Sequence, residues 1–482
     1  MTARKSDRCI VPAKPGNSGG GKAATPSRSS DRASTVRSDG ASVLTRLDYI
    51  TERAGKRPQE VFNNLYHLLD VELLWYAFRK LKRDKAPGVD GVTVEDYEAD
   101  LMANLRGLAL RLKRHSYRPH PSLRREVPKG NGKTRPLGIA SLEDKVVQRA
   151  VVMVLERIYE EDFIDSSFGF RPGRSCHDAL RALGHVIGTK KVNWISDADI
   201  RGFFDNVDHE WLVRMLQHRV KDPQLLWLIC RFLKAGVMID GQRYDTASGV
   251  PQGSCLSPLL ANVYLHYVLD LWVTHVVRRQ QSGEMYLIRY ADDFICAFQY
   301  ESDARRFQEV LSQRLARFGL ELATEKTKLL RFGRFAERDA KRHGEGKPGV
   351  FDFLGFTHYC GHSRAGKFKL KRRTSPKRFR VKLHAIKDWL RANLTTPIDA
   401  VWRMLNRKLQ GHYQYYGVSD NWPQMVVFRE AVLRLAHRWL NRRSQRRSLS
   451  MPTFYGQYIA RYSVAAPRRL VNLFAPVAPK LR

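Results

Sequence analysis

The spacing of apolar residues divides the chain into a polar arm, a mixed central region and a helical C-terminal region. Between Val11 and Val36 no large aliphatic or aromatic residue occurs, and residues 1–42 are rich in Ser, Gly, Lys and Arg. Such a segment has too little apolar surface to fold. We therefore expect residues 1–42 to be a disordered basic arm.

Apolar residues recur every three to four positions in several segments, which predicts amphipathic helices. The folded part is expected to begin with helices between Val61 and Leu81, followed by a further helix through Leu101 and Leu112. Beyond about residue 370 no β-prone run is found, and three more helices are expected. The first is entered through Ser375 and Pro376, the second is capped by Thr396 and Pro397, and the third spans Val427 to Trp439.

Short β-prone runs lie between these helical segments. Residues 124–137 predict two strands joined by a Gly-Asn-Gly turn with a cationic tip. Residues 192–200 predict a strand, and residues 286–298 predict two strands around a tight turn. From about residue 142 to 350 helices and strands alternate without the rhythm of a doubly wound sheet. The fold class is therefore expected to be α+β.

The composition indicates a polyanionic partner. The 482 residues suggest two or three domains, and 84 Lys and Arg against 48 Asp and Glu give a formal charge of +36. Nucleic acid is favoured over a membrane, because no apolar run approaches the roughly 18 residues that span a bilayer. Six scattered cysteines without a CxxC pair indicate reduced thiols in a cytoplasm. The cluster from His358 to His362 offers no second ligand pair, which favours a structural role.

Three aspartates carry the candidate chemistry. Asp292 and Asp293 lie at the turn between two apolar strands, where adjacent like charges repel unless a cation neutralises them. A solvated Asp-Asp turn is the structural alternative. Asp199 ends another predicted strand, with Asp197 and Asp205 nearby as support or capping residues. Carboxylates from one strand end and a neighbouring hairpin can hold two Mg²⁺ ions about 4 Å apart, which is the arrangement used for phosphoryl transfer.

Several ordered blocks give the chain a family resemblance. From about residue 60 to 475 it resembles a group II intron-encoded reverse transcriptase and maturase. The blocks are Arg135-Pro-Leu-Gly-Ile139, Ser167-Phe-Gly-Phe-Arg-Pro-Gly-Arg-Ser175, Asp199-Ile-Arg-Gly-Phe-Phe-Asp205, Gly249-Val-Pro-Gln-Gly-Ser254, Tyr290-Ala-Asp-Asp293 and Phe353-Leu-Gly-Phe356.

This resemblance implies a right-hand polymerase fold, with fingers and palm in residues 43–365 and a helical thumb or maturase X domain in residues 366–482. Asp199 and Asp292 would bind two Mg²⁺ ions, which Mn²⁺ could replace, with help from the carbonyl of Ile200. Asp293 would complete the catalytic trio.

The resemblance also implies roles for residues around the aspartates. Nucleotide-binding residues would be Lys129, Arg135, Phe204, Gln252 and Gly253, with Phe204 excluding a ribose 2′ hydroxyl. A solvated basic turn is the alternative for Lys129 and Arg135, and an ordinary core residue is the alternative for Phe204. Phe353, Leu354, Gly355 and Phe356 would form the primer grip; by pattern alone they are a buried strand.

Basic and aromatic residues supply the expected RNA-binding surface. The candidates are Arg171, Arg174, Arg378, Arg380, Lys382, Tyr413, Arg442 and Arg443. Arg171 and Arg174 could instead pair with Glu160, Glu161 or Asp162.

The sequence thus predicts a bacterial, cytoplasmic RNA-directed DNA polymerase, nucleoid-associated when it is bound to its DNA target. It would use an RNA template, a DNA primer and dNTPs, and would bind intron RNA to assist splicing and mobility. We expect no cysteine-stabilised endonuclease domain, because no cysteine follows Cys360. The alternatives are a retron, defence or diversity-generating reverse transcriptase, or a splicing cofactor without polymerase activity. The oligomeric state is left open.

Overall fold

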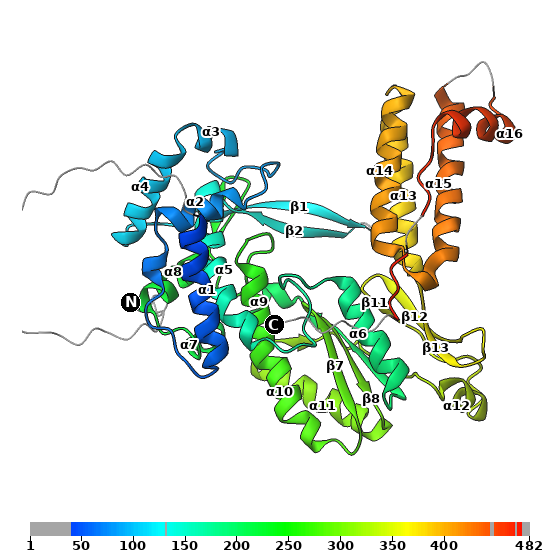
Figure 1. Ribbon diagram of the computed structural model, residues 1–482, viewed down its shortest axis with the longest axis horizontal. Coiled ribbons are helices and arrows are strands. Elements are labelled where there is room, and N and C mark those ends of the chain that lie inside the picture. The colour runs from blue at the N-terminus through cyan, green and yellow to red at the C-terminus, as the bar shows by residue number, and fades with distance from the viewer. Residues whose placement is uncertain (1–39, 131–132, 444–447, 468–469, 475–482) are drawn as a thin grey trace, which may run out of the picture.

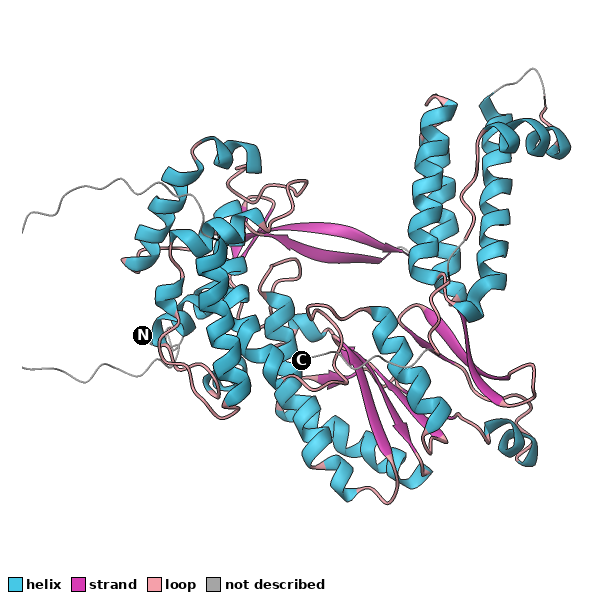
Figure 2. Cartoon of the chain, in the orientation of Figure 1, coloured by secondary structure: helices cyan, strands magenta, loops and turns pink. Residues whose placement is uncertain are grey.

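The computed structural model describes residues 40–130, 133–443, 448–467 and 470–474, and these form a mixed helix and sheet structure (Figures 1 and 2). The expected basic arm lies outside the described residues except for its last three positions, which belong to helix α1. The Asn-Gly tip of the 124–137 hairpin also lies outside them.

Helices dominate the N-terminal part. Asp70 caps α2 by accepting a hydrogen bond from the backbone N–H of Leu73 at 2.9 Å. The segment from Val61 to Leu81 is only partly helical, because Phe62 makes an isolated bridge and residues 66–68 form a short 3₁₀ turn before α2 begins. The helices are α1 (Gly40–Lys56), α2 (Val71–Arg79), α3 (Val94–Ala99), α4 (Leu101–Lys113), α5 (Leu142–Asp162), α7 (His209–Gln217) and α8 (Pro223–Leu233), with the 3₁₀ turn η1 (Tyr66–Leu68).

A long antiparallel hairpin projects from these helices in the direction of the C-terminal helices (Figure 1). Strands β1 (Ser122–Gly130) and β2 (Lys133–Ile139) form it, with Arg125 opposite Leu137. Two short strands, β5 (Val237–Ile239) and β6 (Gln242–Tyr244), extend it to a sheet of order β2-β1-β5-β6. The predicted hairpin is confirmed.

A second four-stranded sheet, of order β10-β3-β8-β7, lies at the centre. Its strands are antiparallel to their neighbours, and helices α6 and α11 pack against it. The sheet consists of β3 (Trp194–Ala198), β7 (Met285–Tyr290), β8 (Asp293–Phe298) and β10 (Lys328–Arg331); next to it lie β4 (Ile200–Arg201), β9 (Glu321–Leu322), α6 (Cys176–Thr189), α11 (Glu301–Arg317) and the 3₁₀ turn η2 (Phe203–Asp205).

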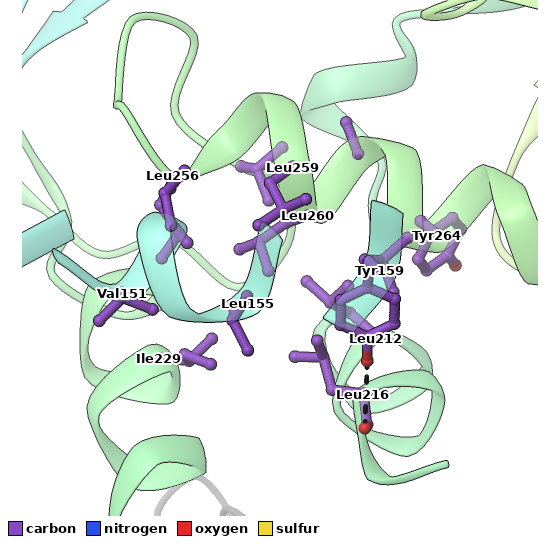
Figure 3. Packing of buried hydrophobic residues seen from close by; sticks show 14 of the residues in the cluster. Val151, Leu155, Tyr159, Leu212, Leu216, Ile229, Leu256, Leu259, Leu260 and Tyr264 are labelled. Carbon is purple, nitrogen blue, oxygen red and sulfur yellow. Dashed lines mark hydrogen bonds between the residues drawn. The ribbon is translucent and has the colours of Figure 1, made fainter. Parts of the chain in front are cut away.

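One large apolar cluster joins the N-terminal helices to this sheet. Figure 3 shows α5 packing its Val151, Leu155 and Tyr159 against residues of α7, α8 and α9, and the Tyr159 hydroxyl donates to the carbonyl of Leu216 at 3.2 Å. The helical run that follows this cluster's Leu256 consists of α9 (Ser257–Leu265), the π-helical η3 (His266–Asp270) and α10 (Leu271–His275), followed by η4 (Val277–Gln280).

The C-terminal part consists of a three-stranded sheet and long helices. Ser375 caps α13 by accepting from the N–H of Arg378, as predicted, whereas α14 has no side-chain cap and Thr396 bonds to Asn393 instead. The elements are α12 (Ala336–Arg342), β11 (Phe351–Phe353), β12 (Phe356–His362), β13 (Phe368–Thr374), α13 (Pro376–Ala392), α14 (Ile398–Tyr416), η5 (Ser419–Asn421), α15 (Trp422–Arg443), α16 (Met451–Thr453) and the π-helical η6 (Phe454–Ile459). No helix in the described ranges is long and apolar enough to cross a bilayer.

Candidate active site

Asp199 directly follows β3, the strand that lies between β10 and β8 in the central sheet. The sheet fixes its backbone: Ala198 pairs with Phe294 on β8, and the N–H of Ala323 donates to the Asp199 carbonyl at 2.8 Å. Ile200, the next residue, is buried on β4. The carboxylate of Asp199 therefore leaves the sheet at a fixed strand end and stays partly exposed.

Asp292 and Asp293 lie at the turn between β7 and β8, as predicted. Tyr290 pairs with Asp293, and only Ala291 and Asp292 form the turn. Ala291 has a φ of 57°, a left-handed conformation that is uncommon for a residue with a Cβ. Because β8 neighbours β3, this turn brings Asp292 and Asp293 to the same end of the sheet as Asp199.

A buried ion pair supports this turn from below. Arg289 on β7 and Asp270 at the end of η3 are both 0% exposed, and the Arg289 Nε donates to Asp270 Oδ1 at 2.7 Å. The Arg289 Nη1 donates to the carbonyl of Ala291 and to Asn262 Oδ1, each at 3.0 Å. Sequence reasoning missed both residues, although an arginine within an apolar β run was the available signal.

Desolvation and neighbouring negative charges raise the pKa values of Asp293 and Asp197. Desolvation raises the pKa of Asp293 to about 6, and the charges of Asp292 and Asp199 act in the same direction. Asp293 keeps a solvent-exposed surface, so repulsion among the carboxylates is the cause that the geometry supports most directly. Desolvation raises the pKa of Asp197 to about 7, with Asp293 as the next cause. The site concentrates negative charge that lacks full compensation.

Lys326 supplies part of the compensation, and sequence reasoning missed it. Its Nζ donates to Asp199 Oδ2 at 2.6 Å, although its side chain is 60% exposed. The hydrogen bond to Asp199 raises the pKa of Lys326. A cation thus already lies on one of the expected metal ligands.

The donor set suits a hard divalent cation without forming a complete cage. Across the described ranges, no three His, Cys, Asp or Glu side chains are arranged closely enough to hold a metal ion by themselves. Mg²⁺ commonly binds through only one or two carboxylates, with substrate phosphates and water as its other ligands. Asp199, Asp292 and Asp293 suit a site in which the protein supplies only some of the ligands of each ion.

Two of the expected nucleotide-binding residues, Arg135 and Gln252, contact each other. Arg135 on β2 donates through Nε to the side-chain oxygen of Gln252, and the N–H of Gly138 donates to the Gln252 carbonyl at 2.7 Å. At Gly253, where φ is 112°, an added Cβ would lie 2.6 Å from the Gly138 carbonyl oxygen. Glycine at this position is therefore explained by packing against β2.

Phe204 and Lys129 lie on other elements, the 3₁₀ turn η2 and the strand β1. Phe204 is 8% exposed and meets Phe203 edge-to-face, with ring centroids 5.3 Å apart. Lys129 lies on β1 near the hairpin tip, and its side chain is outside the described residues.

The expected primer grip is a tight turn between β11 and β12. Phe353 and Phe356 pair across it and are 3% and 0% exposed, which agrees with the buried-strand reading of their side chains. Leu354 and Gly355 form the turn with positive φ values, and the Tyr415 hydroxyl donates to the Leu354 carbonyl at 2.9 Å. Only the turn residues retain partial exposure for a primer contact.

Three of the expected RNA-binding residues form hydrogen bonds with other residues of the chain. Arg171 is 6% exposed and donates to Glu160 and to the carbonyls of Ile164 and Ser167, so the ion-pair alternative is correct. Arg174 donates to the Asp165 carbonyl at 2.6 Å. Tyr413 is buried, and its hydroxyl donates to the Ala465 carbonyl at 3.2 Å, which rules out a stacking platform there. The partners of Arg171 and Arg174 lie close in sequence, whereas the bond from Tyr413 to Ala465 spans 52 residues. RNA contact by Arg174 stays a prediction.

The basic residues of α13 and α15 are arranged differently. Arg378, Arg380, Lys382, Arg442 and Arg443 are all exposed. The charge of Arg378 also acts on the pKa of Asp293, which places the start of α13 near the carboxylates. Further basic residues that sequence reasoning missed line a groove between α13 and α15; they are Lys387, Arg391 and Arg438.

Comparison with known proteins agrees with this geometry. Residues 127–358 match the family described as reverse transcriptase (RNA-dependent DNA polymerase). This range includes the three aspartates, Arg135, Phe204, Gln252 and the β11–β12 turn, and it ends before α13. The chain therefore contains a reverse transcriptase domain.

Its relatives define the family more narrowly. The chain is 39% identical over 231 residues to the group II intron-encoded protein LtrA of Lactococcus lactis subsp. cremoris, covering 47% of this chain and 38% of LtrA. It is 35% identical over 237 residues to YkfC of Escherichia coli (strain K12), covering 43% of this chain and 62% of YkfC. The nuclear intron maturase 1, mitochondrial, of Arabidopsis thaliana is 35% identical over 92 residues, 19% of this chain and 13% of the maturase.

The chain thus spans less than two thirds of each of these relatives. Its reverse transcriptase domain and these similarities support a group II intron reverse transcriptase and maturase.

Proposed function

We propose that this chain is an RNA-directed DNA polymerase that copies an RNA template with dNTPs and binds a group II intron RNA to assist its splicing and mobility. The observation that carries the proposal is the convergence of Asp199, Asp292 and Asp293 at one end of the central sheet, within the reverse transcriptase domain. Carboxylates collected in this way suit phosphoryl transfer.

The architecture supports a right-hand assignment. The N-terminal helices and the β1–β2 hairpin would be the fingers and the central sheet the palm, together residues 43–365. The helices α13 to α15 would be the thumb or X domain, within residues 366–482. Figure 1 shows the hairpin extending from the N-terminal helices to the C-terminal helices.

Asp199, Asp292 and Asp293, with the Ile200 carbonyl, would hold two Mg²⁺ ions, or Mn²⁺ in their place. The ions would supply activation of the primer 3′ hydroxyl and charge neutralisation at the phosphates. The fixed strand end of β3 and the β7–β8 turn hold the carboxylates in place, and Lys326 balances the charge of Asp199 until the site is loaded.

Side chains around the carboxylates would select and orient the substrates. Arg135 and Lys129 on the hairpin would bind the triphosphate, and the present bond from Arg135 to Gln252 would open as the nucleotide enters. Phe204 would lie beneath the sugar and exclude a 2′ hydroxyl. The turn at Leu354 and Gly355 would position the primer end.

The exposed basic residues of α13 and α15 would bind RNA phosphates. Arg378, Arg380, Lys382, Arg442 and Arg443 are the proposed contacts, and the charge of +36 favours a polyanion throughout. LtrA is a group II intron-encoded protein and the Arabidopsis relative is an intron maturase, which supports an intron RNA as the partner here. We place this activity in a bacterial cytoplasm, near the nucleoid when a DNA target is bound.

Primer extension on an RNA template with Mg²⁺ tests the proposal. Asp292→Asn should abolish extension while RNA affinity stays nearly unchanged, because the substitution removes a charge from the metal site and leaves the basic surface intact. Asp48→Asn, which alters an exposed carboxylate paired with Arg157 on α5, is the matched control and should extend normally.

Extension by the Asp292→Asn variant at the native rate would refute the site assignment. A chain that binds and splices intron RNA but never extends a primer would be a splicing cofactor without polymerase activity. A chain that extends primers but gives no selective binding of intron RNA would point to a retron, defence or diversity-generating enzyme.

A further inference from the structure

Phe170 has an unusual conformation for its residue type. It lies in the loop between α5 and α6, with a φ of 59° and 50% of its surface exposed. A bulky aromatic residue in the left-handed region carries a conformational penalty that glycine would avoid. Neither burial nor backbone preference therefore explains a phenylalanine at this position.

The loop around Phe170 is held rigidly on both sides. Asn262 Nδ2 donates to the Gly169 carbonyl at 2.7 Å, and the N–H of Phe168 donates to the Arg289 carbonyl at 2.9 Å. On the other side, the buried Arg171 donates to the Ser167 carbonyl at 2.9 Å. The surroundings thus impose the strained backbone, and strain imposed in this way is characteristic of active sites.

The loop lies directly against the catalytic turn. A Cβ added to Gly169 would come within 2.2 Å of the backbone nitrogen of Ala291, the residue before Asp292. Only glycine permits this approach. Phe170 is consequently one residue away from a direct contact with the turn that carries the carboxylates.

The ring of Phe170 also contacts Phe204, the residue proposed to exclude a ribose 2′ hydroxyl. It meets Phe204 edge-to-face, with centroids 6.5 Å apart and the planes at 80°. Phe204 is nearly buried, whereas half of Phe170 faces solvent. The two rings form an aromatic corner beside the carboxylates, and Phe170 is its exposed side.

We propose that Phe170 is a specificity-determining residue of the nucleotide site, which contacts the sugar of the incoming deoxynucleotide and holds the Phe204 ring in place. The proposal rests on the proposed function. Without the Phe170 ring, Phe204 could turn away from the sugar, and the corner would admit a ribose 2′ hydroxyl.

Single-nucleotide extension with a dNTP and the matching rNTP tests this role. Phe170→Ala should reduce the preference for the dNTP about three- to tenfold, the range expected from losing one aromatic pair. The double variant Phe170→Ala/Phe204→Ala should discriminate no worse than Phe204→Ala alone, because residues that act together are non-additive. Phe335→Ala, at an exposed phenylalanine just before α12, is the matched control and should keep the native preference.

Phe170→Gly removes the same ring and adopts the positive φ without strain, so it serves if the alanine variant folds poorly. An unchanged dNTP preference in the folded Phe170 variant would overturn the proposal, as would an equal loss of rate with both nucleotides. These results differ from failure of the proposed function, in which the native chain itself would not extend a primer.

Discussion

The buried pair of Arg289 and Asp270 gives the sharpest test of how the β7–β8 turn is held. Asp270→Asn keeps the side-chain volume but leaves the Arg289 guanidinium without its counter-charge in a site where both residues are 0% exposed. His266 lies 3.9 Å from Asp270 but is neutral at pH 7, because burial lowers its pKa to about 4. His266 therefore carries no positive charge whose loss could offset the unpaired charge of Arg289.

Breaking one half of a buried ion pair costs about 3 to 5 kcal/mol. For a domain of the size that contains this pair, each kcal/mol lowers the melting temperature by about 2 to 4 °C. The Asp270→Asn variant should therefore melt roughly 6 to 20 °C below the native chain. Since a chain of this size has more than one domain, the relevant quantity is the transition of the domain that contains the central sheet.

A double variant separates stability from positioning. Arg289→Met/Asp270→Leu removes both charges and should recover much of the lost free energy of unfolding. Polar groups that lose their hydrogen-bond partner still cost about 1 to 3 kcal/mol. The Ala291 carbonyl and Asn262 Oδ1 would no longer receive hydrogen bonds from Arg289. We expect the double variant to fold but to extend primers poorly, because the Ala291–Asp292 turn loses its anchor.

Scanning fluorimetry and primer extension well below the lowest melting temperature measure the two effects. Glu52→Gln removes an exposed pair with Lys56 on α1 and should change neither readout. The reasoning would be refuted if Asp270→Asn melted with the native chain. Native extension rates in the folded double variant would show that the pair stabilises the fold without positioning Asp292.

Three further predictions concern the substrates. Phe204→Ala should raise ribonucleotide incorporation roughly tenfold or more, and unchanged discrimination in single-nucleotide extension would contradict its place under the sugar. Lys326→Met should tighten Mn²⁺ binding to the nucleotide-free chain about two- to fivefold, because the Lys326 ammonium no longer competes with the metal for Asp199. Paramagnetic titration measures the Mn²⁺ affinity, and an unchanged affinity would show that Lys326 does not compete with the metal. RNA affinity should fall steeply with salt, and Arg380→Ala should lower the slope of log affinity against log salt by about one, whereas Tyr413→Phe should leave it unchanged.

Features encoded locally were predictable from the sequence. The β-prone run before Asp199 and the paired runs around Asp292 place these residues at strand ends, because alternation and turn chemistry act over a few residues. The Ser375 cap of α13 follows the same logic. Helix α1 was missed, although Val43, Leu47 and Ile50 carry helical spacing, because its first turn falls within the polar arm.

Features that depend on distant partners were not predictable. Lys326 is 127 residues from Asp199, and its contact arises only when β10 and β3 are paired in the central sheet. Tyr413 looked like a stacking platform because its neighbours are also aromatic, yet Ala465 accepts its hydroxyl across 52 residues. The residue type alone does not tell whether such a side chain contacts the rest of the protein or an external partner, because tertiary packing decides this.

Several unfavourable local features lie around the β7–β8 turn, although His115, Asp240 and Leu354 also have positive φ. Ala291 and Phe170 both have positive φ, and carboxylates with raised pKa values adjoin the same turn. Elsewhere helix caps, strand pairing and apolar burial agree with one another, so these departures are not signs of a poorly specified fold. A fold that keeps strain and uncompensated charge side by side must hold them by its surroundings, as the buried Arg289 and Asn262 do here. This coincidence supports assigning the turn and the Phe170 loop to a single catalytic centre.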